Sequence, residues 1–563
     1  MKGGLGRGEP RVKGAWGVGS LGCLRREING GREPATRPNG RTLAACDSTG
    51  RMSAASDPMG RVTNEMTTLA GLRQALLAAD YGLEAVTERL GESALAGLQR
   101  NTSMAAVDAL GSSEDPQATL ISLFALQRTV PALQARAALG NLAALQQAEL
   151  IDTDGDQVRA AVEIRPYGFA DAEGDWEGWI VHDLNTTLDS RGTEPRPDFV
   201  LGASPASTTL AQLTVPTPVG RALDLGTGCG IQVLHLARHA ASITATDLNP
   251  RALKLARATL ALNELDADLR LGSLYEPVAD DRFDLIVTNP PFVMSPPTGE
   301  RLVYREGSFA ADGLMREVVA KAAAHLTRTG VLQVVGNWAV IKDEDPARRL
   351  SSWLGTMDAL VIERERLDPY EYIEVWLADA GQLHAPGSTE RYRAWLDYFA
   401  AHRIEAVALG WINAFAGGQG RRDYLSWPHA VAQPVGPAMA TYPQALDASQ
   451  LSDVRFLAQR WQRPEGVVQE TIGEPGAADP QHIVLRQQFG LARAVTADTA
   501  LAAVVGACDG ELRLGDLLDA VAGLLEVPAE ALIADLLPRL RTLVEQGFLV
   551  PDEPLALGVG RWA

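Results

Sequence analysis

The strongest constraint on the fold is a glycine-rich stretch, DLGTGCG, which runs from Asp224 to Gly230. It follows a short apolar run, RALDL, typical of a buried strand, and precedes an apolar-periodic run typical of a helix. Glycine lets the chain turn sharply and lets its backbone approach a ligand closely. Because a tight strand-to-helix turn belongs to α/β architectures, the stretch predicts a mostly parallel sheet covered by helices.

The sequence around this turn alternates between apolar strands and amphipathic helices. Predicted strands lie at 221–225, 242–246, 269–271, 283–288, 331–335, 373–377 and 406–409. Predicted helices at 232–240, 251–262 and 314–326 separate several of these strands. The alternation predicts a seven-stranded α/β domain over residues 185–432.

The remaining sequence predicts accessory regions on both sides of this domain. Residues 1–65 are rich in Gly, Arg, Pro and Ser, so we expect either a disordered segment or a start site assigned too far upstream. Residues 66–184 predict a domain of helices followed by short strands, suited to docking a substrate. Residues 433–450 predict a linker, and 451–563 predict a helix-rich domain that resembles a winged helix.

Charge and cysteine content limit the classes of function. The chain has 51 Lys and Arg against 70 Asp and Glu, a formal net charge of −19, which lowers the expectation of nonspecific nucleic-acid binding. A local basic patch, for example at Arg421 and Arg422, remains open. Because the 4 cysteines have no metal-ligand spacing and no apolar run reaches the roughly 20 residues of a membrane span, we expect a reduced, cytoplasmic protein without bound metal.

The glycine-rich turn also has a chemical pattern. Asp224 stands ahead of Gly226, Gly228 and Gly230, where its carboxylate can bind an ammonium group, and the N-terminus of the next helix suits a carboxylate. The dinucleotide pattern G-x-G-x-x-G, in contrast, positions a pyrophosphate. The pattern therefore favours an adenosine ligand with an amino-acid group over NAD, with a ligand-free turn as the alternative.

A second acidic residue supports an adenosine ligand. Asp247 ends the next predicted strand, 23 residues after Asp224, where a carboxylate can bind both ribose hydroxyls. Its alternative role is to cap the helix that starts near Pro250. Asn249 can take that capping role instead, so both roles for Asp247 stay open, and Asn249 is also a candidate cofactor-binding residue.

The most specific motif is Asn289-Pro-Pro-Phe292, which directly follows the predicted strand 283–288. Two prolines fix the backbone and remove two N–H donors. The Asn289 side-chain oxygen and the Pro290 carbonyl can then accept both hydrogens of an NH2 group, and Phe292 can stack on a planar substrate. The alternative is a rigid turn without a ligand.

The two motifs together resemble the class I methyltransferases with a [DN]-P-P-[FYW] signature, over roughly residues 200–340. That superfamily includes release-factor glutamine methyltransferases of the HemK/PrmC type, guanine-N2 rRNA methyltransferases and adenine-N6 enzymes. The resemblance implies a Rossmann-like fold and S-adenosylmethionine (SAM) as cofactor, and Ser273 stands where the HemK type has an adenine-binding Asp. The three-part layout resembles an actinobacterial branch of these enzymes.

The resemblance implies the reaction and leaves the substrate open. We expect methyl transfer to a planar nitrogen, first of all an exocyclic amine of a base in rRNA or tRNA, with RNA or a ribonucleoprotein as partner. A protein glutamine, a small molecule, and a catalytically retired module that binds nucleic acid or protein remain as alternatives.

Overall fold

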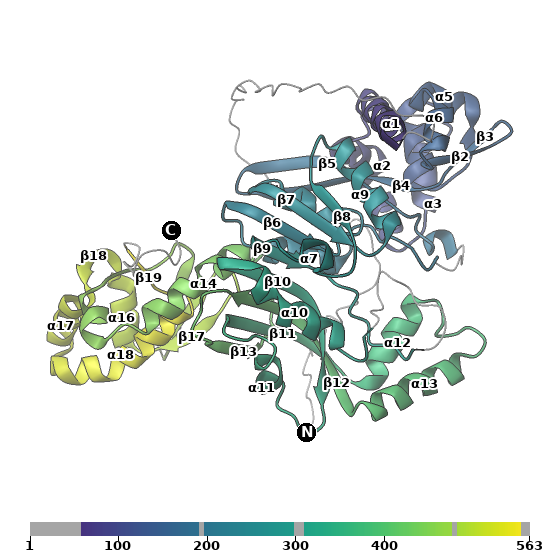
Figure 1. The fold of residues 1–563 in the computed structure, drawn as a ribbon. Coiled ribbons are helices and arrows are strands. Elements are labelled where there is room, and N and C mark those ends of the chain that lie inside the picture. Colours follow the sequence, from purple (N-terminus) through teal and green to yellow (C-terminus); the bar gives the residue numbers. More distant parts are fainter. Residues whose placement is uncertain (1–57, 191–195, 298–308, 476–480, 553–563) are drawn as a thin grey trace, which may run out of the picture. The chain divides into compact units, whose positions relative to one another are not determined.

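The computed structural model describes residues 58–190, 196–297, 309–475 and 481–552. The chain divides into two compact units (Figure 1). One holds the described residues before 194 together with Ala261–Glu264, and the other holds the rest. Most of the expected disordered segment 1–65 lies outside the described residues, but helix α1 (Pro58–Ala78) begins eight residues before the expected domain start at 66.

The first unit contains helices followed by short strands. After α1 come α2 (Leu83–Gln99), α3 (Met104–Leu110), α4 (Pro116–Leu120), β1 (Val130–Pro131), α5 (Ala132–Leu139), α6 (Leu142–Gln147), β2 (Ile151–Asp154), β3 (Gln157–Ala160), β4 (Glu163–Asp171) and β5 (Gly174–His182). The antiparallel sheet β1-β3-β2 encloses α5 and α6 in sequence, which is the arrangement of a winged helix. Strands β4 and β5 form a separate hairpin.

An eight-stranded sheet forms the centre of the second unit, in the order β13-β11-β12-β10-β9-β6-β7-β8 (Figure 1). The strands are β6 (Val219–Leu225), β7 (Ala240–Asp247), β8 (Asp268–Leu271), β9 (Phe283–Thr288), β10 (Leu326–Ile341), β11 (Asp358–Leu367), β12 (Ile404–Phe415) and β13 (Arg422–Ser426). Only β12 runs antiparallel to its neighbours β10 and β11. The predicted Rossmann-like α/β class is confirmed, with one strand more than the predicted seven.

Helices cover both faces of this sheet (Figure 1). Helices α7 (Pro205–Leu213) and α14 (Gly436–Ser449) contribute Leu210 and Met439 to one apolar core, while α10 (Gly313–His325) and α11 (Pro346–Ser351) contribute to the other. Helices α8 (Ile231–Leu236) and α9 (Pro250–Leu262) connect the strands nearest the glycine-rich turn. Burial on both faces explains why these strands are apolar runs without alternation.

One predicted strand is wrong. Residues 373–377 belong to α12 (Pro369–Asp379), and two strands are missing from the prediction, β11 and β13. The Asp368 side chain accepts the Glu371 N–H at 2.9 Å and Pro369 occupies the first turn, which starts a helix. Alternating apolar residues suggested a strand there, but α12 packs beside α13 (Ser388–Ala401). This tertiary packing decides between the two-residue repeat of a strand and the 3.6-residue repeat of a helix.

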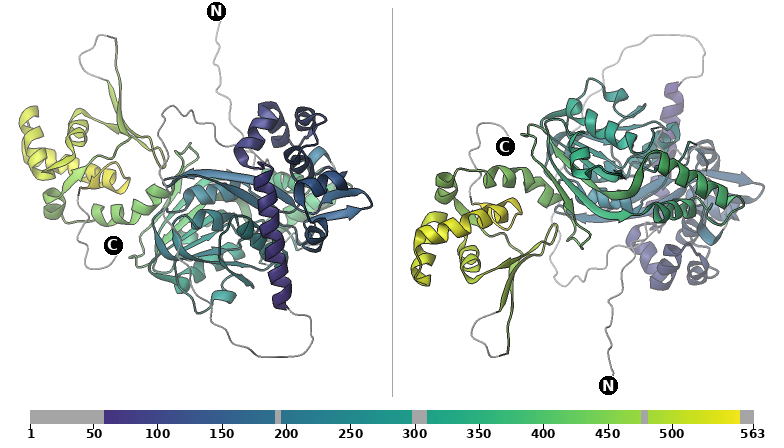
Figure 2. Two further views of the ribbon diagram at one scale, coloured as in Figure 1. Left: turned by 90° about the horizontal axis from the view of Figure 1, so that it is seen from above. Right: turned by 90° about the horizontal axis from the view of Figure 1, so that it is seen from below.

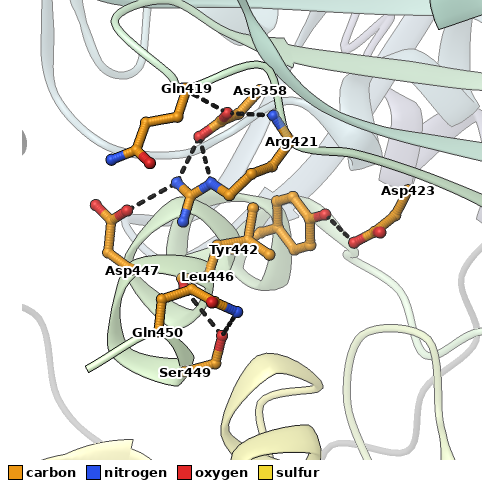
Figure 3. Close-up of polar contacts among 9 residues, drawn as sticks. All are labelled: Asp358, Gln419, Arg421, Asp423, Tyr442, Leu446, Asp447, Ser449 and Gln450. Carbon is orange, nitrogen blue, oxygen red and sulfur yellow. Dashed lines mark hydrogen bonds and ion pairs between the residues drawn. The ribbon is translucent and has the colours of Figure 1, made fainter. Parts of the chain in front are cut away.

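The predicted linker 433–450 is mostly helix α14, which is bonded to the sheet (Figure 3). Arg421 Nη2 donates to Asp358 at 2.5 Å and to Asp447 of α14 at 2.7 Å. Tyr442 Oη donates to Asp423 of β13 at 2.5 Å. Arg421 therefore fastens a helix and does not form the basic patch that its sequence position left open.

The C-terminal part combines helices with short strands. It contains α15 (Asp453–Ala458), β14 (Arg460–Gln462), β15 (Val467–Ile472), β16 (His482–Gln487), β17 (Ala494–Ala497), α16 (Thr499–Ala507), β18 (Asp509–Arg513), α17 (Leu514–Leu525), α18 (Ala529–Glu545) and β19 (Val550–Pro551). The sheet β18-β14-β19 with α16, α17 and α18 resembles a winged helix. Strands β15 and β16 extend beyond its helices in both views of Figure 2. In the part of the chain that the structure describes, no helix is both long and apolar enough to cross a membrane.

Candidate cofactor and amine site

The sheet register brings the predicted site residues to one edge. Asp224 pairs with Ala245 of β7 and with Val287 of β9, so the carboxyl ends of these three parallel strands lie next to one another. Asp247 ends β7, and Asn289 directly follows β9. Ligands of open α/β sheets bind at this edge, because the loops that leave the strands there can converge on one molecule.

The glycine-rich turn adopts a backbone that requires glycine. Gly226, Gly228 and Gly230 have φ of +81°, +55° and +86°, which L side chains rarely adopt. The Gly226 and Thr227 N–H groups both donate to the Thr246 carbonyl at 2.9 Å, which fastens the turn to the end of β7. A Cβ built on Gly226 or Gly228 would meet nothing within 4 Å, so open space adjoins the turn.

Asp224 is a buried carboxylate with a free oxygen. Its side chain is 1% exposed, and no described residue bonds to Oδ2. Burial, together with the smaller effect of the neighbouring Asp247, raises the pKa of Asp224 to about 7. A buried carboxylate without a partner is costly, and an ammonium group brought by a ligand would remove that cost. The site thus fits the amino group of SAM.

Asp247 bonds to the backbone on both sides. Its Oδ2 accepts the Gly228 N–H at 2.9 Å and its Oδ1 accepts the Asn249 N–H at 2.8 Å. Each carboxylate oxygen keeps one more lone pair, so two ribose hydroxyls can still bind. Burial raises the pKa of Asp247, while these backbone bonds oppose the increase.

Asn249, a candidate both for capping the helix and for binding the cofactor, caps the helix. Its Oδ1 accepts the Arg251 N–H and its Nδ2 donates to the Asp198 carbonyl, both at 2.9 Å. These bonds assign it to the start of α9 and do not direct it at a ligand. Ser273 is half-buried. It lies at the same sheet edge, because the preceding residue Gly272 donates its N–H to the Asp247 carbonyl at 3.0 Å.

The Asn289-Pro-Pro-Phe292 turn presents an unpaired acceptor. No described residue bonds to Asn289 Oδ1, although that atom is buried. Pro290 is buried and Phe292 is half-buried. Thr288 Oγ1 donates to the Leu225 carbonyl at 2.6 Å, so the strand end that carries Asn289 is fastened to the strand end that precedes the glycine-rich turn.

Helix α12 supports the segment after this turn through Tyr372 and Trp376, a role that the sequence did not predict. Tyr372 Oη, fully buried, accepts from the Met294 N–H and from Asn337 Nδ2, both at 3.0 Å. Trp376 contacts Phe292 edge to face, with ring centroids 6.1 Å apart. The helix-start signal Asp368-Pro369 could have revealed that these aromatic residues lie on one helix.

Four features define a class I, SAM-dependent methyltransferase domain. The sheet is doubly wound with β12 antiparallel to its neighbours. Asp224 precedes the glycine-rich turn, Asp247 ends the next strand, and Asn289 precedes two prolines. The family model of the methyltransferase small domain matches residues 204–360, which include Asp224, Asp247 and Asn289. A second model, a domain of unknown function named DUF7059, matches residues 78–161.

Curated relatives support the same class. The chain is 33% identical to a release factor glutamine methyltransferase of Deinococcus radiodurans, over 36% of this chain and 77% of that protein. It is 32% identical to a ribosomal RNA small subunit methyltransferase C of Idiomarina loihiensis, over 28% of this chain and 43% of that protein, so it spans less than half of that relative. The chain belongs to the HemK/PrmC-like class I methyltransferases, which use SAM.

Solved structures include a T. Thermophilus 16S rRNA N2 G1207 methyltransferase in complex with AdoMet and guanosine. It is 20% identical, with a TM-score of 0.23, over 40% of this chain and 58% of that chain.

Proposed function

We propose that the protein transfers the methyl group of SAM to a planar NH2 nitrogen, first of all an exocyclic amine of an RNA base. The observation that carries the proposal is the buried, unpaired Oδ1 of Asn289 at the same sheet edge as Asp224. An acceptor in that position needs a donor from outside the described chain, and an NH2 group supplies one.

The residues of this chain would act mainly by positioning. SAM supplies an activated methyl group when bound. Asp224 binds the ammonium of its amino-acid part, Asp247 binds its ribose, and Ser273 lies where the adenine would bind. Asn289 Oδ1 and the Pro290 carbonyl accept the two N–H hydrogens of the substrate, which directs the nitrogen lone pair away from them and toward the methyl donor. Phe292 provides an aromatic face for a planar substrate.

A protein glutamine is the second candidate substrate. The coverage of 77% of a release factor glutamine methyltransferase favours it, since a side-chain amide presents the same planar NH2. The acidic chain also favours a protein or ribonucleoprotein over bare RNA. On α18, Arg539 pairs with Asp498 at 2.5 Å and Arg541 with Asp453 at 2.7 Å, so neither supplies a free charge to phosphate.

The test is methylation of extracts from a deletion strain by the full-length protein with radiolabelled SAM. Label that nuclease removes supports the base, and label that protease removes supports the glutamine. Mass spectrometry of RNA and protein from the strain then locates the missing methyl group. A retired binding module would transfer no label, and calorimetry would detect no SAM binding.

A further inference from the structure

A second buried carboxamide with an unpaired oxygen lies on β10. Asn337 is 1% exposed, and its Oδ1 atom has no hydrogen-bond partner in the described chain. Its Nδ2 atom donates to Tyr372 Oη at 3.0 Å, so one half of the amide is bonded and the other half is not. A buried acceptor without a donor is costly, and a ligand that brings an N–H would remove that cost.

The other buried carboxamides on strands of this sheet have partners for their oxygens. Gln333 Oε1 accepts the Val215 N–H at 2.7 Å, and Asn413 Oδ1 accepts from Gln333 Nε2 at 2.9 Å. Across the residues that the structure describes, the buried amide oxygens without a partner belong to Asn289 and Asn337. Packing inside the sheet therefore satisfies its amides, and the exceptions need a separate explanation.

The register of the sheet places Asn337 beyond the end of β9. Val334 of β10 pairs with Thr288, the last residue of β9, and β10 continues past that point to Ile341. Asn337 belongs to this continuation, and Asn289 begins the turn that leaves β9 at the same edge. Both unpaired oxygens are therefore carried by adjacent strands, on the side of the sheet where the proposed substrate binds.

Side-chain contacts hold Asn337 beside the Asn289-Pro-Pro-Phe292 turn. A Cβ built on Gly336, the residue before Asn337, would lie 3.5 Å from Cδ1 of Phe292. Tyr372 Oη, which accepts from Asn337 Nδ2, also accepts the Met294 N–H at 3.0 Å. One hydroxyl thus connects the Asn337 amide to the segment that follows the turn.

The chemistry of an acceptor in this place limits the substrate. Asn289 Oδ1 and the Pro290 carbonyl would already hold both hydrogens of the NH2 group, so a further acceptor needs an N–H on the atom next to that amine. The amines of adenine and cytosine are next to ring nitrogens without hydrogen, and the amide of glutamine is next to a carbonyl oxygen. The 2-amine of guanine is next to N1–H.

We propose that Asn337 is a second substrate-binding residue, which accepts the N1–H of a guanine whose 2-amine is bound at Asn289. This inference rests on the proposed methyl transfer and adds the base to it. The guanine edge would donate three hydrogens to three acceptors: Asn289 Oδ1, the Pro290 carbonyl and Asn337 Oδ1. Adenine, cytosine or glutamine would place a lone pair against Asn337 Oδ1, and two facing acceptors leave both without a donor.

The identity of the methylated nucleoside tests the base. The full-length protein would transfer label from SAM to RNA of a deletion strain, and the RNA would be digested to nucleosides and separated. We expect the label in N2-methylguanosine. Label in a methylated adenosine or cytidine, or in protein as methylglutamine, would overturn the role of Asn337 and leave methyl transfer to an NH2 nitrogen in place. No label in RNA or protein would instead contradict the proposed function itself.

Two inhibitors of that reaction test Asn337 directly. Guanosine and 2-aminopurine riboside both carry the 2-amine, but only guanosine has N1–H. Guanosine should inhibit the wild type at least about tenfold more strongly, because 2-aminopurine leaves the acceptor unpaired. Asn337→Leu removes the acceptor and should lower this ratio at least about fivefold. Asn337→Asp keeps an acceptor oxygen and should retain the ratio.

Asn413→Leu is the matched control, because it removes a buried amide of the neighbouring strand whose oxygen is bonded inside the sheet. The ratio of two inhibitors does not depend on the fraction of folded protein, so a purely structural role of Asn337 would leave it unchanged. We expect the wild-type ratio in Asn413→Leu. A wild-type ratio in Asn337→Leu, or an equal loss in Asn413→Leu, would overturn the proposal.

Discussion

The Asp247 carboxylate accepts the backbone N–H of Gly228 at 2.9 Å, which joins the end of β7 to the middle of the glycine-rich turn. The turn also donates to the Thr246 carbonyl. Its backbone is therefore held by the neighbouring strand before any ligand binds, and preorganised groups lose less entropy on binding.

Asp247→Ala should weaken SAM binding by about 1–3 kcal/mol, because the variant loses the ribose contacts and leaves the Gly228 N–H unpaired. Calorimetry with SAM measures the change. Asp266→Ala, an exposed acid before β8, is the matched control and should bind as the wild type does. Equal affinities of the two variants would remove Asp247 from the site.

SAM affinity should depend on pH through Asp224. Since burial raises the pKa of Asp224 to about 7, the carboxyl is mostly protonated below that pH and cannot pair with an ammonium group. Affinity should fall by about tenfold for each pH unit below 7 and level off above it. Asp224→Asn should bind SAM weakly and without this dependence. The same slope in that variant would assign the titration to another group.

Asn289→Ala should reduce methyl transfer at least about 100-fold while SAM affinity changes less than about twofold, because the lost acceptor positions the substrate only. Single-turnover rates with labelled SAM and calorimetry provide the two measurements. Asn141→Ala, which removes an exposed cap in the first unit, controls for a general effect of losing an Asn. An unchanged transfer rate would exclude the amine-binding role.

Arg421→Met should destabilise the second unit by about 1–3 kcal/mol, because Asp358 and Asp447, 3% and 8% exposed, would lose their common cation. The exposed Arg455→Met is the control. Urea unfolding at neutral pH measures the difference.

Acid should have a related effect on the wild type. Although burial opposes ionisation, the bonds from Arg421 hold the pKa of Asp358 below its usual range. A lowered folded-state pKa stabilises the protein above the unfolded-state value, and this contribution is lost as pH falls through the folded-state pKa. The difference between wild type and Arg421→Met should therefore shrink in acid, and a constant difference would contradict the pairing.

Some elements could be predicted because their signals are local. The glycine-rich turn and Asn289-Pro-Pro-Phe292 each fix their own backbone, through φ angles that need glycine and through prolines that remove donors. Helix α12 could not be identified from its alternating apolar residues, because their spacing fits both a strand and a helix. Only the packing of α12 against α13 shows which of the two forms. Arg421 could not be assigned either, since its partners lie 63 and 26 residues away.

The sequence by itself determined that the sheet is of the Rossmann-like α/β class and that the cofactor is SAM. It also determined the candidate site residues at the glycine-rich turn and at Asn289-Pro-Pro-Phe292. Such information is short-range, since it resides in backbone restrictions and in the spacing of a few side chains. Only the tertiary structure decided which polar atoms remain without partners among the described residues, notably Asp224 Oδ2 and Asn289 Oδ1. Whether a buried group has a hydrogen-bond partner depends on segments that are distant in the chain, and local pattern does not contain that information.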